Sequence, residues 1–143
     1  STDLAHTTKI IMAPTIREKD GLAMSSRNRY LSEEGRKQSA AIPKALALIA
    51  KEFLNGEKSI DHLMKSGLSE LKKEKLTPQY LEFRKVEDLT QKCEGNIFEE
   101  TVVALAQIIE FEEISTRLID NIVLGNDSAN TKALEELIAK AFA

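Results

Sequence analysis

Several residue types are scarce in this 143-residue sequence, which has one cysteine, two histidines, three prolines and no tryptophan. The single cysteine, Cys93, excludes an intrachain disulfide and favours a reducing compartment such as the cytoplasm. No histidine lies near Cys93 in the sequence, so nothing indicates an activated thiol nucleophile. His6 and His62 are too far apart to form a metal-ligand motif, and we expect both to be surface residues with no metal bound.

Long apolar runs are also missing. A membrane-spanning helix needs about 20 apolar residues, and the sequence has no run that approaches this length. The N-terminus lacks the hydrophobic segment of a signal peptide. A hydrophobic fraction of 42%, a charged fraction of 30% and a net charge of -3 are typical of a folded globular domain. We therefore expect neither a membrane nor a nucleic acid as a partner.

The periodicity of the apolar residues predicts helices first and neighbouring strands afterwards. This order favours an α+β fold with a small antiparallel sheet of about three strands packed with helices. Helix is an alternative for residues 101–109, and residues 86–89 are expected to add one helical turn. Pro43 should kink the first helix or begin a second one. The expected strands are residues 9–13, 79–86, 101–109 and 117–124. The expected helices are residues 33–54, 59–75 and 132–142. The first of these helices should end at Asn55-Gly56, and the second should be capped by Ser59 or Asp61.

The segment from residue 14 to residue 30 carries the strongest functional signal. It contains four cations and two anions, so it is positively charged within an acidic chain. Ser25 and Ser26 lie directly before Arg27. Arginine, hydroxyls and free backbone N–H groups are the donors that a phosphate needs. The alternative reading is a solvated loop, and the spacing matches neither a Walker loop nor a dinucleotide-binding glycine motif.

Residues 14–31 closely resemble the segment that joins the two domains of the pantoate–β-alanine ligase family. Two further motifs follow in the same order as in that family. Tyr-Leu-Glu-Phe-Arg at residues 80–84 resembles the family's Tyr-Leu-Glu-Leu-Arg strand, and residues 116–121 match its Thr-Arg-Leu-Ile-Asp-Asn motif. The first motif is long and specific, whereas the other two would be weak alone.

The resemblance implies an ATP-dependent ligase of the nucleotidylyltransferase superfamily. Pantoate attacks the α-phosphate of ATP to give pantoyl adenylate and pyrophosphate, with assistance from Mg²⁺. The amine of β-alanine then displaces AMP and forms pantothenate. The resemblance also implies that the complete enzyme is a homodimer, and that this chain is the C-terminal lid domain of a class I nucleotidylyltransferase-type ligase.

The family motif also implies roles for individual residues. Ser25, Ser26 and Arg27 would hold the triphosphate and stabilise the charge that moves onto pyrophosphate. Met24 would lie against the nucleotide, and Ile16 occupies the position of a family valine whose backbone meets adenine. Lys19 and Asp20 are additional ATP-site candidates, with plain surface charge as the alternative. Arg117, Asp120 and Asn121 match a family motif, but we expect them to form a network that fixes the end of a strand.

The chain departs from the family mainly in length, because a complete synthetase is about twice as long. The N-terminal Rossmann-like domain, with its His-x-Gly-His-type motif and pantoate pocket, has no counterpart here. We expect residues 1–14 to be the last strand and linker of that domain, residues 15–127 to be the ATP-closing domain, and residues 128–143 to form an extra helix. The isolated chain should be inactive and should bind ATP weakly.

Three other readings stay open at this point. The chain could be the lid domain of a different adenylate-forming ligase that uses the same loop. It could be a non-catalytic interaction or dimerisation module, in which an apolar face mediates self-association. It could also be a structural domain whose basic loop is only solvated.

Overall fold

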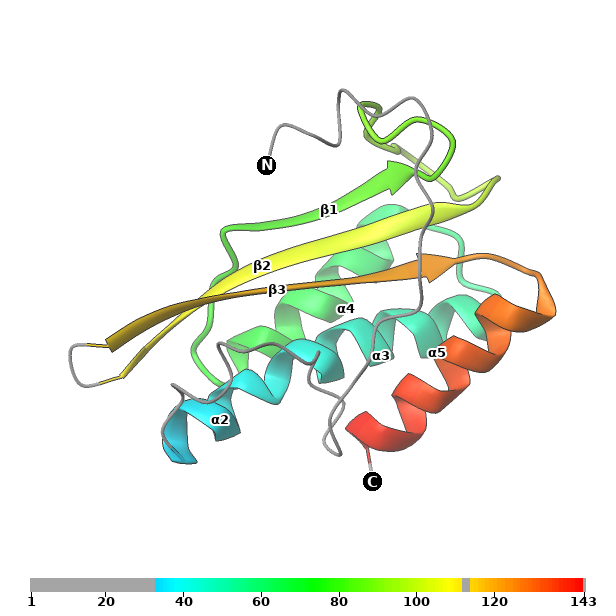
Figure 1. Cartoon of the computed structure of the whole chain (residues 1–143). Helices are drawn as coiled ribbons and strands as arrows, with labels where there is room; N and C mark the ends of the chain where they lie inside the picture. Colours follow the sequence, from blue (N-terminus) through cyan, green and yellow to red (C-terminus); the bar gives the residue numbers. More distant parts are fainter. Residues whose placement is uncertain (1–32, 112–113, 143) are drawn as a thin grey trace.

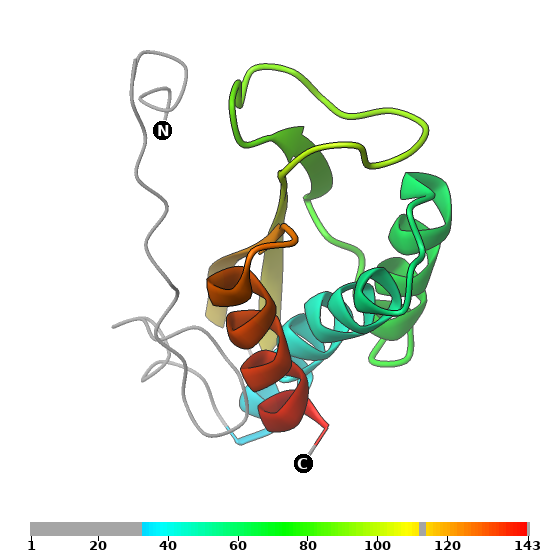
Figure 2. The ribbon, with the colours of Figure 1, turned by 90° about the vertical axis from the view of Figure 1, so that its right-hand side faces the viewer.

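The computed structural model describes residues 33–111 and 114–142, which form four helices and one three-stranded antiparallel sheet (Figure 1). Helices α3, α4 and α5 cover one face of the sheet, as the second view shows (Figure 2). The expected α+β fold is confirmed, whereas the strand expected at residues 9–13 lies outside the described residues. The elements are α2 (Glu33–Ser39), α3 (Ala41–Leu54), α4 (Ile60–Lys72), β1 (Tyr80–Lys85), β2 (Thr101–Phe111), β3 (Ile114–Leu124) and α5 (Ser128–Ala141).

Helices α2 and α3 are separate, with the break at Ala40. Pro43 is the third residue of α3, where its missing N–H removes no helical hydrogen bond. The expectation that Pro43 marks a second helix is therefore confirmed. Helix α3 ends where the sequence indicated, because Asn55 is its C-cap and Gly56 has a positive φ of 104°.

Helix α4 begins after Ser59, whose side chain accepts a hydrogen bond from the backbone N–H of His62. Helix α4 ends at Lys72, three residues before the predicted end at Lys75. Lys75 has a φ of 60°, in the left-handed region. Gly67 is a point of close approach between α4 and α3, because an ideal Cβ there would lie 2.8 Å from Cδ1 of Ile49. The glycine that weakens this helix therefore also lets it pack closely.

The strand order is β1–β2–β3, so β2 pairs on both sides. Leu105 of β2 aligns with Leu81 of β1 and with Asp120 of β3. This pairing confirms the strand at residues 101–109 and shows that the helical alternative was wrong. Strand β3 begins at Ile114, three residues before the prediction. The core between the sheet and the helices contains, among others, Ile42, Leu46, Ile49, Leu63, Phe83, Val103, Ile109, Leu118, Ile122 and Leu124.

The connection from β1 to β2, residues 86–100, contains no helical turn, so the expectation for residues 86–89 was wrong. Asp88 forms a turn instead: its side chain accepts hydrogen bonds from the N–H and hydroxyl of Thr90, which compete with helical hydrogen bonding. Several hydrogen bonds attach the connection to the domain, and two of them lie near its two ends. Arg84 donates to the carbonyl of Leu89, and the N–H of Ile97 donates to the carbonyl of Lys58.

Helix α5 begins at Ser128, four residues before the start that the apolar periodicity indicated, and within the range 128–143 expected for the extra helix. Asp127 caps it by accepting a hydrogen bond of 2.8 Å from the N–H of Asn130. Leu134, Leu137 and Ala141 are buried on its inner side, where α5 packs against α3 and β3. This helix therefore belongs to the same core as the sheet.

Candidate functional site

The segment with the strongest sequence signal lies outside the described residues. This applies to Ile16, Lys19 and Asp20 and to the Met24–Arg27 motif, so their contacts stay predictions. The chain enters the described part at Glu33, the first residue of α2. Helix α2 packs against β2 and α3. We refer to this part of the domain, α2 with the residues of the sheet beside it, as the α2 end.

The motif at residues 116–121 lies inside β3 and is divided between the two faces of the sheet. Asp120 is 3% exposed and alternates with exposed residues along the strand. Arg117 is exposed, and its Nε donates a 2.6 Å hydrogen bond to Oε1 of Gln79, which precedes β1. The backbone N–H of Asn121 donates to Oδ1 of Asp120. Strand alternation places the side chains of Arg117 and Asp120 on opposite faces of the sheet, and the expected network of these three residues stays a prediction.

A buried amide lies on β2 near the Thr77 loop. Gln107 is 3% exposed, and its Nε2 donates to the carbonyls of Thr77 and Ile108 at 3.1 and 3.0 Å. Its Oε1 has no hydrogen-bond partner among the described residues. The side chain of Gln107 thus holds the segment before β1 against the sheet. Buried acceptors such as its Oε1 commonly accept a hydrogen bond from a buried water.

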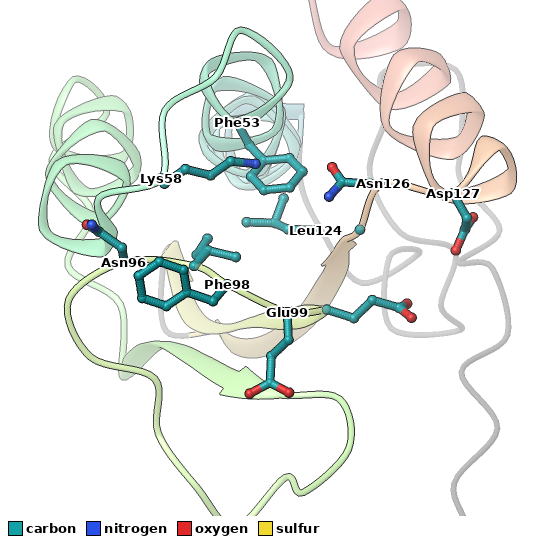
Figure 3. Close-up of a pocket in the computed structure, with 11 residues that line it drawn as sticks. Phe53, Lys58, Asn96, Phe98, Glu99, Leu124, Asn126 and Asp127 are labelled. Carbon is teal, nitrogen blue, oxygen red and sulfur yellow. The ribbon is translucent and has the colours of Figure 1, made fainter.

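A cavity of about 540 Å³ opens at the other end of the sheet (Figure 3). Its walls come from the end of α3, the link from α3 to α4, the connection that leads into β2, and the link from β3 to α5. We call it the distal cavity. It is lined by Phe53, Lys58, Asn96, Ile97, Phe98, Glu99, Glu100, Leu124, Gly125, Asn126 and Asp127.

The charged groups of the distal cavity have different partners. Nζ of Lys58 lies 4.1 Å from the centroid of the Phe53 ring, a cation–π contact. Glu99 forms a 3.1 Å ion pair with Lys85. The hydrogen bond between these two side chains, together with the negative charge of Glu99, raises the pKa of Lys85 above its ordinary value of 10.5. Glu100 accepts a 3.2 Å hydrogen bond from Nδ2 of Asn130.

Metal and nucleophile chemistry finds little support in the described part. Residues 33–111 and 114–142 contain no group of three or more His, Cys, Asp or Glu residues that could hold a metal ion. His62 is exposed, as expected, and lies 3.4 Å from Glu52 and 3.6 Å from Glu57. Cys93 is half-buried, with its sulfur 3.8 Å from Oγ1 of Thr101. None of the helices in these two ranges is long and apolar enough to cross a membrane.

Sequence analysis identified no residue of the distal cavity as a candidate site residue. These residues come from four separate segments, so no local motif connects them. Two signals were nevertheless present: a cluster of acidic residues in the connection 86–100, and Phe98 within it. Phe98 could have been noticed because an aromatic residue beside two glutamates fits neither a buried strand nor a solvated loop.

Comparisons with known proteins agree with the sequence resemblance. The family model described as pantoate-beta-alanine ligase matches residues 1–123. The pantothenate synthetase of Geotalea uraniireducens (strain Rf4) is 40% identical over 126 residues, which cover 87% of this chain and 43% of that protein. The pantothenate synthetase of Clostridium acetobutylicum is 42% identical over 121 residues, 83% of this chain and 41% of that protein.

A solved structure shares the fold as well. The crystal structure of pantothenate synthetase from Thermus thermophilus superposes with a TM-score of 0.68 at 31% identity, covering 80% of this chain and 39% of that one. The chain thus spans less than half the length of the relatives that it matches. Because the family model covers most of the chain and both other comparisons agree, this chain belongs to the pantoate-beta-alanine ligase family.

Proposed function

We propose that this chain is the C-terminal, ATP-closing part of a ligase that condenses pantoate with β-alanine. The observation that carries the proposal is the family match over residues 1–123, because it includes the whole basic segment and nearly all of the three strands. The complete reaction would use ATP and release AMP and pyrophosphate. The pantoate and β-alanine sites would lie in the part of the protein that this chain does not contain.

The proposed contribution of this chain to the chemistry is a phosphate clamp. In the first step the pantoate carboxylate attacks the α-phosphate, and the bond to the leaving pyrophosphate breaks. Arg27 would neutralise the charge that develops on pyrophosphate, and the hydroxyls of Ser25 and Ser26 would donate hydrogen bonds to it. Met24 and the backbone of Ile16 would hold the nucleotide. In the second step the amine of β-alanine attacks the acyl carbon and AMP leaves.

Two further residues and the metal complete the proposed site. Lys19 would add a second cation near the phosphates, and Asp20 would orient that cation or a bound Mg²⁺. The described residues offer no metal-binding cluster of their own. Mg²⁺ would bind with ATP, mainly in the N-terminal part that this chain does not contain.

The described domain would serve as the rigid body that carries the clamp. The clamp segment leads directly into α2, which packs against β2 and α3. A rigid sheet-and-helix layer behind a functional loop allows the loop to close over a substrate with a defined geometry. Residues 15–127 would then form the closing domain, residues 1–14 the link to the N-terminal part, and the complete enzyme a cytoplasmic homodimer.

The test is pantoate-dependent exchange of radiolabelled pyrophosphate into ATP. The complete polypeptide that contains this chain should catalyse this exchange with pantoate, and should form pantothenate when β-alanine is added. The isolated chain should catalyse neither reaction. Exchange that requires a different carboxylic acid would assign the chain to another adenylate-forming ligase. Turnover by the isolated chain would disprove the proposed division of the active site.

A further inference from the structure

The connection from β1 to β2 combines strong negative charge with an exposed aromatic ring. Residues 86–100 contain five acidic residues and one lysine, so the segment has a net charge of -4, compared with -3 for the whole chain. Phe98, near its end, is 90% exposed. An aromatic side chain at this exposure forgoes the stabilisation of burial. A surface that keeps such a ring beside several carboxylates has the composition of a binding site.

The distal cavity lies directly beside this ring. Phe53 and Leu124 are buried and form an apolar wall, and Phe98 extends at the opposite lip (Figure 3). Polar groups surround this apolar centre, including Asn96 and Glu99. An apolar centre with a polar rim is the usual arrangement of protein interfaces, and exposed aromatic side chains are the typical anchors. A volume of about 540 Å³ accommodates one or two side chains of a partner.

The charges of the cavity favour a cation. Three carboxylates and one ammonium line it. Glu99 is already paired with Lys85, so Glu100 and Asp127 carry the negative charge that is open to a partner. The ammonium of Lys58 already lies over the ring of Phe53. Glu100 accepts one hydrogen bond from Asn130, whereas a carboxylate can accept about four hydrogen bonds. An arginine or lysine at the rim would find further acceptor positions there.

The cavity is separate from the α2 end. Phe53 lies near the end of α3, and at 1.5 Å per residue it is about 18 Å along the helix from Ala41, where α3 begins next to α2. Asn126 and Asp127, which complete the cavity, lie beyond residue 123, where the family match ends. The cavity is therefore built partly by a segment outside the matched region, and its occupant need not be a substrate of the family reaction.

We propose that the distal cavity is a docking site for a partner protein segment that presents an arginine or lysine beside an apolar side chain. The apolar side chain packs against Phe98, whose ring is 90% exposed. The cationic side chain binds the carboxylate of Glu100, with Asp127 next to it. This interaction adds to the proposed ligase function and does not depend on it.

The test is an amide NMR titration of this chain with a capped peptide, Gly-Leu-Arg-Leu-Gly, and with the same peptide carrying Gln in place of Arg. The Arg peptide should shift the resonances of residues 53, 58, 96–100 and 124–127, and the Gln peptide should bind about five-fold more weakly. Because the contact includes exposed charges, binding should weaken in high salt.

Four substitutions separate the parts of the site. Phe98→Ala should weaken peptide binding about five-fold or more, and it should not unfold the chain because the ring is 90% exposed. Ile119→Ala, at another exposed apolar residue outside the cavity, is the matched control and should leave binding unchanged. Glu100→Gln keeps an acceptor for Asn130 but removes the charge, so it should weaken binding about two-fold. Lys58→Gln removes a positive charge from the cavity, so it should strengthen peptide binding about two-fold.

Several results would overturn the proposal. Equal binding of the Arg and Gln peptides would show that charge does not select the partner. Equal shifts caused by n-butylammonium at the same concentration would indicate a site for small amines instead of a protein segment. Concentration-dependent shifts of the same residues without peptide would indicate a second copy of this chain as the occupant.

Discussion

The α2 end and the distal cavity differ in what makes each of them recognisable. The α2 end follows a long, specific sequence motif whose chemistry can be named residue by residue, although the motif itself lies outside the described residues. The distal cavity matches no motif, yet its geometry and charges are fully described. Motifs therefore identify chemistry that a family shares, whereas geometry identifies sites assembled from distant segments.

The two regions also depend on the shared core in different ways. The α2 end rests on β2 and the beginning of α3, in the part of the chain that the family model matches. The distal cavity needs the end of α3 and the start of α5, which begins beyond the matched residues. Substitutions can therefore disturb both regions together or the distal cavity alone.

The largest effect on stability is expected from Leu105→Ala. Leu105 is fully buried on the central strand, between Leu81 and Asp120. Its loss should lower the free energy of unfolding by about 2–5 kcal/mol, because the truncation leaves a cavity. Urea denaturation of the chain measures this change. Ile119→Ala, on a residue that is 50% exposed, should cost about 1 kcal/mol or less; an equal loss for both would contradict the proposed position of the core.

A smaller effect, confined to the distal end, is expected from Asp127→Ala. This change removes the N-cap of α5 and should lower the free energy of unfolding by about 1 kcal/mol. Amide hydrogen exchange should increase in the first turn of α5 but not in α2. Asp127→Asn keeps an oxygen acceptor and is the control, with most of the stability retained. Unchanged exchange in the Ala variant would show that α5 begins independently of this cap.

The smallest effect concerns the turn in the connection between β1 and β2. Hydrogen bonds from the hydroxyl and N–H of Thr90 hold the pKa of Asp88 below its ordinary value of 3.8. A depressed pKa in the folded state stabilises the fold above pH 3.8, and this contribution is lost as the pH falls through the folded pKa. Thr90→Val should raise the pKa of Asp88 toward 3.8 in a carbon-detected NMR titration. A pKa that stays unchanged would exclude the hydroxyl as the main cause.

Sequence patterns predicted most of the fold because its elements are locally encoded. Ser59 marked the start of α4, Asn55-Gly56 marked the end of α3, and the apolar run after Thr101 marked the central strand. The misses have equally local causes. The cap at Asp127 begins α5 four residues early, and Asp88 closes a turn where one helical turn was expected.

The candidate sites were harder to predict from the sequence than the fold. The basic segment was found because its residues are contiguous, but its contacts with ATP depend on parts of the protein that the described residues do not include. Arg117 and Asp120 were expected to act together, and strand alternation places them on opposite faces. The distal cavity forms only when Phe53, Phe98 and Leu124 meet in the folded chain, so no window of sequence could reveal it.

The proposed function depends above all on the segment before α2, which would clamp the phosphates of ATP. The most direct measurement is the single-turnover rate of pantoyl adenylate formation by the complete polypeptide, compared between Arg27→Ala and Lys140→Ala. Both variants lose one positive charge, but Lys140 is exposed on α5. We expect a loss of about 100-fold or more for Arg27→Ala and an unchanged rate for Lys140→Ala. An unchanged rate for Arg27→Ala would contradict the proposed clamp.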